Sequence, residues 1–335
     1  MKNSAATAVL LDSALLGVVA SFQGGCVEDL LPYARDYAAA FALDMPLPSC
    51  ASISNLDYMW ARTLVTALGR EVDRARTTTR LTRYCPHMWT VTSVNLAAAR
   101  GYLDVLQALH AANHLQTSPD ALNEAAANGH MDVVRFLHEH GQSGCTVRAM
   151  NGAAQYGHLD VVQFLDSHRS EGCTVTAMNA AAINGHYEIV EYLHMHRSEG
   201  CTTSAMDGAA KNGHLSLVTF LQTHREEGCT TDAMDGALLY HHVDVATYLH
   251  AHRDEGCTPH ALYAAAYEGD LVNLRFLCET RLEPFRQDVL DAAVAQGHVA
   301  AVSYLHAVWR VDAVTAMTNS VTAHAQEWRR RLTKA

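Results

Sequence analysis

The stretch GCTVRAMNGAAQYGHLDVVQFLDSHRSE, residues 144–171, recurs along the chain with a constant length of 28 residues. The glycine before its histidine has counterparts at the same spacing at Gly101, Gly129, Gly157, Gly185, Gly213, Gly269 and Gly297, with His241 replacing the glycine between Gly213 and Gly269. The Gly-Cys-Thr step recurs at Gly144, Gly172, Gly200, Gly228 and Gly256. A fixed period of this length is typical of a stacked array of repeats, in which each unit contacts only its neighbours.

Each unit is predicted to form two helices. Thr146 can cap the first helix, and the apolar residues that follow it are spaced to form one helical face. Gly157 can end this helix, because glycine adopts the left-handed conformation at little cost. The second helix has an apolar stripe and an acid, Asp160, in its first turn, where the helix dipole favours negative charge. Neither helix can bury its apolar face alone, so stacking on neighbouring units is expected.

The sequence Gly-His-Leu-Asp-Val-Val-x-Phe-Leu, preceded by Ala-Ala-x-x, resembles the core of the ankyrin repeat. The resemblance covers roughly residues 88–311 and implies an all-α solenoid of stacked helix-turn-helix units. Each unit is five residues shorter than the 33-residue ankyrin repeat, so there is no room for the usual β-hairpin. The family's Thr-Pro-Leu-His is also missing, and Thr258-Pro259-His260-Ala261 is its nearest approach. The resemblance further implies that the first helices line a concave side that binds protein.

The period divides the chain into three parts. Eight repeats are expected over residues 88–311, after a non-repeat helical region at residues 1–87 that caps the array. Residues 312–335 are predicted to form a polar half-repeat that caps the other end. The N-terminal region contains an arginine-rich stretch, which we interpret as a solvated connector or, alternatively, a docking site for an acidic partner. Its arginines are Arg62, Arg70, Arg74, Arg76, Arg80 and Arg83.

Composition limits the partners and the location. The formal net charge is −11, which argues against a nucleic-acid partner, since such a partner requires a basic surface. No apolar run approaches the roughly 18 residues needed to span a bilayer, and residues 1–22 read as an amphipathic helix rather than a signal peptide. The absence of an Asn-x-Ser/Thr sequon also favours a cytoplasmic (intracellular) protein with no membrane partner.

The cysteine and histidine columns are interpreted as structural. Neighbouring repeats lie too far apart for disulfides between column cysteines, so these are expected to be free, buried thiols. This column holds Cys145, Cys173, Cys201, Cys229 and Cys257, and then Phe285. One histidine column is expected on the core side of the second helix, bonded to its last carbonyls: His140, His168, His196, His224 and His252. A second is expected to tie successive loops together: His130, His158, His186, His214 and His298.

No pattern in the sequence points to catalysis. There is no P-loop, His-Glu-x-x-His or Cys-x-x-Cys motif, and the His-x-His pairs face apart on a helix. We therefore expect no enzyme activity, no catalytic residue, no cofactor and no metal site.

Columns that vary between repeats mark the expected binding surface. On the first helix they lie opposite the repeated apolar face, and some carry aromatic or aliphatic residues of the kind that anchor protein interfaces. The predicted partner-binding residues are Arg148, Asn151, Gln155, Ile183, Lys211, Asp232, Asp235, Leu239, Tyr263 and Tyr267. The alternative is an ordinary helix surface whose residues have drifted.

These observations predict a monomeric scaffold that binds a partner protein through its first helices. The alternative is a substrate-receptor adaptor, for example of a ubiquitin ligase, in which residues 1–87 dock a second protein.

Overall fold

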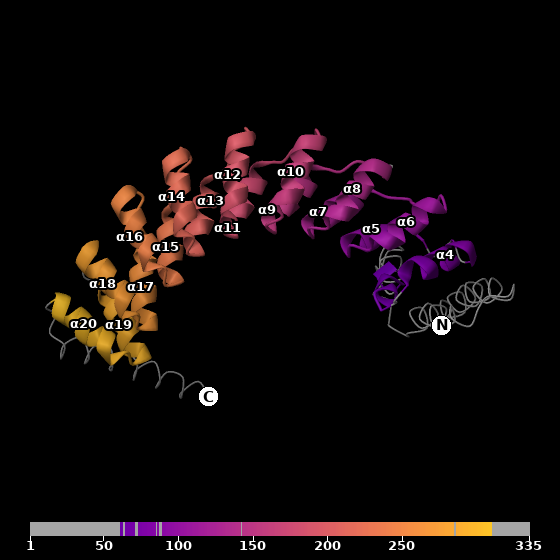
Figure 1. Ribbon diagram of the computed structural model, residues 1–335. Coiled ribbons are helices and arrows are strands. Elements are labelled where there is room, and N and C mark those ends of the chain that lie inside the picture. The colour runs from indigo at the N-terminus through magenta and orange to yellow at the C-terminus, as the bar shows by residue number, and fades with distance from the viewer. Residues whose placement is uncertain are drawn as a thin grey trace, which may run out of the picture. The chain divides into compact units, whose positions relative to one another are not determined.

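The computed structural model describes residues 61–309, except positions 63, 71, 72, 85, 87, 88, 142 and 285. These residues form helices and connecting turns, without a strand among them, as the repeat pattern predicts (Figure 1). They fall into two compact units that meet in sequence between Cys173 and Thr174. The segments predicted within residues 1–60 and 312–335, and Phe285, lie outside the described residues.

The first unit begins with residues 61–68, helical apart from the undescribed position 63, and continues as a series of helices. These are α4 (Arg74–Tyr84), α5 (Val91–Ala99), α6 (Leu103–Ala111), α7 (Pro119–Ala127), α8 (Met131–His140), α9 (Val147–Gln155) and α10 (Leu159–His168). From α5 onward each odd-numbered helix is the first of a pair and the next helix is the second.

The second unit continues the same alternation of first and second helices. It contains α11 (Val175–Ile183), α12 (Tyr187–His196), α13 (Thr203–Lys211), α14 (Leu215–His224), α15 (Thr231–Leu239), α16 (Val243–His252), α17 (Pro259–Glu268), α18 (Leu271–Arg275), the π-helical segment η3 (Phe276–Thr280), α19 (Gln287–Gln296) and α20 (Val299–Trp309). Here α18 and η3 together form one second helix. Within each unit, first helices pack against the first helices of neighbouring pairs.

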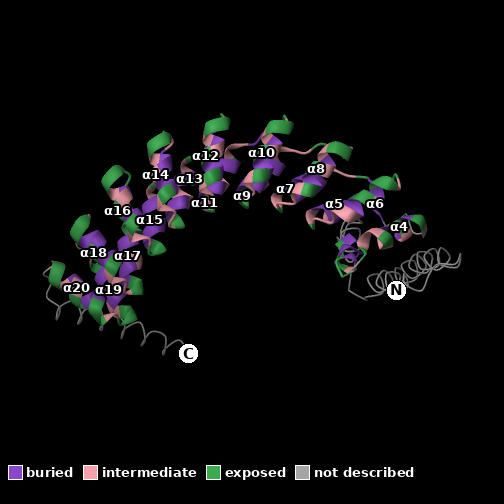
Figure 2. Ribbon diagram, viewed as in Figure 1, coloured by how far each residue is buried: buried purple, intermediate pink, exposed green. Residues whose placement is uncertain are grey.

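The pair α9–α10 shows how the period specifies the fold. The Thr146 side chain accepts a hydrogen bond from Arg148 N and caps α9, as predicted. The predicted apolar faces of both helices are buried (Figure 2), at Ala149, Met150, Ala153 and Ala154 on α9 and at Val161, Val162 and Leu165 on α10. Gly157 has φ +87°, the left-handed conformation that ends a helix.

A histidine of one repeat fills the space left by a glycine of the preceding repeat. A Cβ placed on Gly129 would lie 2.5 Å from the His158 ring, and one on Gly213 would lie 2.5 Å from the His242 ring. His130 Nε2 lies 3.1 Å from Ala99 O, so this nitrogen carries the proton and donates to the carbonyl. The prediction that this column ties successive loops together is confirmed at this junction.

A second contact between repeats replaces the missing β-hairpin. In the loop before Gly-Cys-Thr, an arginine and a glutamate two residues later form an ion pair, as in Arg225–Glu227. Glu227 also accepts a hydrogen bond from the backbone N of Cys201 in the preceding repeat, at 3.5 Å. The hydrogen bond from Arg225 is the main reason that the pKa of Glu227 is lowered to about 2. The same ion pair recurs at Arg169–Glu171, Arg197–Glu199, Arg253–Glu255 and Arg281–Glu283.

The column cysteines are free, as predicted. Burial is complete only for the three central ones, Cys173, Cys201 and Cys229, whereas Cys145 and Cys257 are half-buried. Desolvation raises the pKa of the Cys201 thiol to about 11.

The histidines at the end of the second helices are exposed, so their predicted core-side position is wrong. The predicted bond to a carbonyl is present: His168 Nδ1 lies 3.0 Å from Phe164 O. The His168 ring stacks on the Phe164 ring with the centroids 4.4 Å apart. This stacking draws the histidine to the outer side of α10, away from the buried stripe of Val161, Val162 and Leu165.

The arginine-rich stretch is not the solvated connector that the sequence suggested. It includes α4, which packs on α6 and buries Thr78, Leu81 and Thr82. Arg74 Nε donates to Asp104 at 3.0 Å, and its guanidinium lies 4.6 Å from the centre of the Tyr102 ring. The expected pairing of this stretch with acids of the array is therefore present at Arg74.

Candidate protein-binding groove

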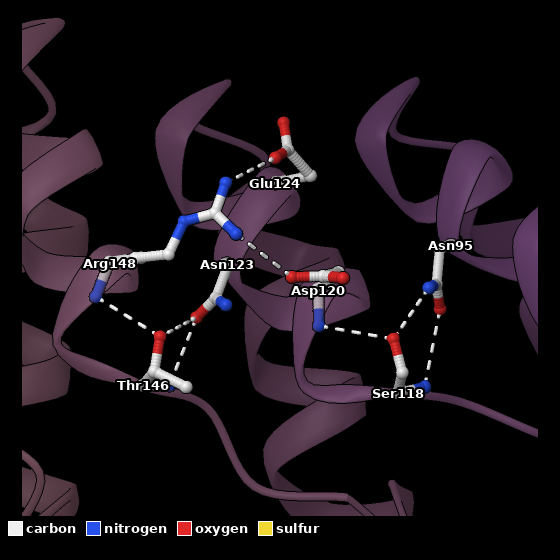
Figure 3. A network of polar contacts seen from close by, with 7 residues as sticks. All are labelled: Asn95, Ser118, Asp120, Asn123, Glu124, Thr146 and Arg148. Carbon is white, nitrogen blue, oxygen red and sulfur yellow. Dashed lines mark hydrogen bonds and ion pairs between the residues drawn. The ribbon is translucent and has the colours of Figure 1, made fainter.

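The outermost predicted column begins with Arg148, an exposed residue on α9. Its guanidinium lies 3.2 Å from Asp120 and 3.6 Å from Glu124, both on the neighbouring first helix α7 (Figure 3). Ion pairs this exposed contribute little to stability, so the Arg148 side chain can exchange these partners for others. The counterparts of Arg148 in this column, Asp232 and His260, are also exposed.

The next predicted column holds the repeats together. Asn123 Oδ1 accepts from the backbone N of Thr146 at 3.0 Å, and Asn95 and Ser118 make the equivalent contact one repeat earlier (Figure 3). In the second unit, Asp235 accepts from Thr258 N at 2.8 Å and from Thr258 Oγ1 at 2.6 Å. The argument that a variable column cannot pack against a repeated partner is wrong here, because asparagine and aspartate both accept from the same threonine.

The third predicted column leans over the next first helix. Ile183 is half-buried rather than exposed, and a Cβ on Gly208 would lie 2.2 Å from its Cγ1. Lys211 covers Gly236 in the same way, and its ammonium lies 5.3 Å from the centre of the Tyr240 ring. Leu239 and Tyr267 are each 47% exposed, and Gln155 is exposed on α9.

A groove of about 320 Å³ opens on the first helices α13, α15 and α17 of the second unit. Its lining residues are Asp207, Gly208, Lys211, Asp232, Asp235, Gly236, Leu238, Leu239, His260, Ala261, Ala264, Ala265, Glu268 and Asn273. Four predicted residues therefore come together here, namely Lys211, Asp232, Asp235 and Leu239.

The other predicted residues do not line this groove. Arg148, Asn151 and Gln155 belong to the first unit, and Ile183, Tyr263 and Tyr267 lie in the second unit outside the lining. Tyr263 and Tyr267 nevertheless continue from it, because His260 stacks with Tyr263 at 6.2 Å between ring centres and Tyr263 with Tyr267 at 6.3 Å. An aromatic row thus extends from one edge of the groove.

The sequence comparison agrees with this architecture. The family model for ankyrin repeats in three copies matches residues 94–174 and 150–235. Residues 94–235 are ankyrin repeats. Ankyrin repeats are generally protein–protein interaction modules and are typically non-enzymatic. No curated protein matches the chain in sequence.

The groove's three first helices lie only partly within the matched ankyrin repeats. α13 and most of α15 are inside residues 94–235, whereas α17 and α18 follow them and continue the same helix pairs. Within the part of the chain that the structure describes, no helix is both long and apolar enough to cross a membrane.

Several lining residues were missed when the ankyrin repeats were read from sequence. Asp207, Glu268 and Asn273 were not predicted to bind, although Asp207 shares a column with Asp235. Asn273 occupies a second-helix position that is aliphatic in the other repeats, so a comparison of second helices could have found it. Glu268 follows Tyr267 at a helix end and has no such signal.

The carboxylates give the groove a negative charge. Asp207, Asp232, Asp235 and Glu268 line it, against the single ammonium of Lys211. The pKa of Asp207 is raised, first by burial and further by the nearby charge of Asp232, although hydrogen bonds from Thr230 oppose the rise. The ankyrin-like surface therefore has an acidic groove with one apolar residue, Leu239, exposed beside it.

Proposed function

We propose that the chain is a protein-interaction scaffold whose first helices bind a partner protein, with the groove on α13, α15 and α17 at the centre of the contact. The observation that carries this proposal is the groove itself, because it gathers Lys211, Asp232, Asp235 and Leu239 on one surface. Protein interfaces are built around such concave, partly apolar centres with polar residues at the rim.

The aromatic row supports the same surface. Tyr267 is 47% exposed and stacks with Tyr263, which in turn stacks with His260 at the groove. Tyrosine is enriched at interfaces because it supplies a large apolar area and a hydroxyl with few rotatable bonds. We assign Tyr263 and Tyr267 to the rim of the contact and Leu239 to its centre.

Site-specific photo-crosslinking tests this assignment. A photoreactive amino acid replaces Lys211, Leu239 or Tyr267 on the first helices, and the full chain is irradiated in an extract of the source cells. Matched controls carry the same group at Glu191 and Thr247, which are exposed on the second helices α12 and α16. We expect one discrete adduct from the first-helix positions and none from the controls.

Two results contradict the proposal. One is an adduct that forms equally from both surfaces, and the other is an adduct confined to Glu191 and Thr247. A double substitution of Tyr263 and Tyr267 by Ala should also weaken the adduct, while the melting temperature stays close to that of the parent chain, because surface substitutions usually change stability by about 0.5 kcal/mol or less.

A further inference from the structure

Asn273 places a polar side chain where the array otherwise has a buried aliphatic one. The equivalent residues on the other second helices are Val105, Val133, Val161, Ile189, Leu217, Val245 and Ala301, all of them buried. Asn273 is itself only 3% exposed. A polar group in this position is costly unless it is hydrogen-bonded, so its presence requires an explanation.

Only half of the Asn273 amide is satisfied. Its Nδ2 donates to Leu238 O at 2.6 Å, an arrangement that fixes the orientation of the amide, because a carbonyl can only accept. Its Oδ1 is buried and accepts no hydrogen bond from any residue that the structure describes. Because Asn273 also lines the groove, this oxygen is an acceptor at the groove without a donor.

The charges around this acceptor select the kind of donor. Asp207 and Asp235 lie on one side with their threonine partners, and Asp232 and Glu268 are exposed lining residues. The ammonium of Lys211 lies close to the Tyr240 ring rather than at the acceptor. An anionic ligand is repelled by such a set of carboxylates, whereas a cationic donor is attracted by it.

The volume limits the size of what enters. At about 320 Å³ the groove is near the lower end of the 300–1,000 Å³ typical of ligand sites. It is therefore suited to one long side chain rather than to a large cofactor. Among the described residues, no group of three histidine, cysteine or acidic side chains is placed to hold a metal ion.

We propose that the groove binds a lysine or arginine side chain of the partner protein, with Asn273 Oδ1 accepting a hydrogen bond from its ammonium or guanidinium group. Asp232 and Glu268 balance the positive charge, and Leu239 packs on the aliphatic part of the side chain. Charge-assisted hydrogen bonds are the stronger kind, and the fixed acceptor gives selectivity over neutral side chains. This inference rests on the proposed function, because it names the residue class that the first-helix surface recognises.

The test measures binding of the full chain to fluorescent nonapeptide pools, each degenerate except for one fixed central residue. The fixed residue is Lys, Arg, Gln, Leu or Glu. We expect the Lys or the Arg pool to bind about tenfold or more tightly than the Gln pool, and the preference to shrink at high salt. The result for Lys against Arg decides which of the two side chains is preferred.

Two variants locate the selectivity. Asn273→Leu installs the residue that α14 has at the same position and removes the unpaired acceptor, so the preference for the basic pools should fall by roughly tenfold. Asp232→Asn changes an exposed residue, cannot disturb the core, and should lower the preference by a few-fold. The matched control is Asp160→Asn, exposed on α10 in the first unit, which should leave it unchanged.

The inference is overturned if neutral or acidic pools bind as well as the basic pools, or if Asn273→Leu and Asp232→Asn both keep the full preference. Its failure is distinct from that of the proposed function. If adducts still form from Leu239 and Tyr267 while no basic preference exists, the surface binds protein by other means. If those adducts are absent as well, both proposals fail.

Discussion

The helix pairs α11–α14 and α15–α18 belong to one unit and share one period, but they use it differently. In the first set, Ala210, Gly213 and Leu217 keep the residue types that the array repeats. At the same positions 28 residues later stand Leu238, His241 and Asn273's neighbour in the period, Val245, and Asn273 itself follows one repeat further on. Leu238 and Asn273 both line the groove. Regular columns thus report packing, and departures from them report the candidate site.

The second helices differ in backbone as well. α14 is α-helical throughout, whereas α18 passes into the π-helical η3 after five residues. π-helical turns occur frequently at functional sites, because the extra residue redirects the side chains around it. The irregular backbone therefore coincides with the irregular sequence.

The strongest way to break the comparison is to exchange the two residue types. Leu217→Asn should lower the free energy of unfolding by about 3 kcal/mol, because it buries an amide in a fully packed core. Asn273→Leu, the reverse change, should raise it by roughly 1 kcal/mol, since an unsatisfied oxygen is removed. Chemical denaturation measures both. Equal losses for the two variants would show that Asn273 is an ordinary core residue.

A second pair of substitutions tests the repeat junctions. Gly213→Ala forces a Cβ into a backbone with φ +77°, 2.5 Å from the His242 ring, and should cost about 1–3 kcal/mol. His241 already has φ +64° and its Nδ1 lies 2.7 Å from Asp270 Oδ2. His241→Gly relieves backbone strain and loses that contact, so the net change should stay within about 1 kcal/mol. Thermal melting of both variants gives the comparison.

A third test addresses a contact that both regions share. Glu227→Gln should lower the free energy of unfolding at pH 7 by roughly 1 kcal/mol, because it removes the partner of Arg225. Since the folded pKa of Glu227 is lowered to about 2, its stabilisation is present above the ordinary value of 4.5 and is lost as the pH falls from there towards 2.

The parent chain and the Glu227→Gln variant should therefore converge in stability in acid. The exposed neighbour Glu226 supplies the control: Glu226→Gln should match the parent chain at every pH. A difference between parent and Glu227→Gln that persists at pH 2 would contradict the assignment.

The smallest expected difference concerns the cysteines. Burial raises the pKa of Cys201 and of Cys257 to about 11, two units above 9.0, so both thiols should react roughly 100-fold more slowly at pH 8 than in the denatured chain. Cys257 is half-buried and Cys201 buried, so Cys257 should be labelled first. Mass spectrometry after timed alkylation reports the order, and faster labelling of Cys201 would show that the central column opens more readily.

The sequence predicted the helix pairs because Thr146, Gly157 and the Ala-Met-Ala-Ala face act locally and recur. It also placed Lys211, Asp232, Asp235 and Leu239 on one surface, since they share first-helix columns. It could not show that Ile183 is covered, because that depends on how closely Gly208 allows the next helix to approach. Asn273 was missed because attention stayed on first helices, although the groove also reaches a second helix.

The glycine–histidine contact has a consequence for how such an array can change in length. The glycine belongs to one repeat and the histidine to the next, so the two positions that must match lie on opposite sides of every boundary. At the exception both have changed: His241 replaces the glycine, and Asp270 replaces the histidine. Duplication or deletion of 28 residues within the regular part preserves every match, because each glycine still meets a histidine. A copy of the repeat that ends in His241 would instead place that histidine against another histidine. Growth by whole periods is therefore open to the regular repeats, while the repeats around the groove are fixed in their order.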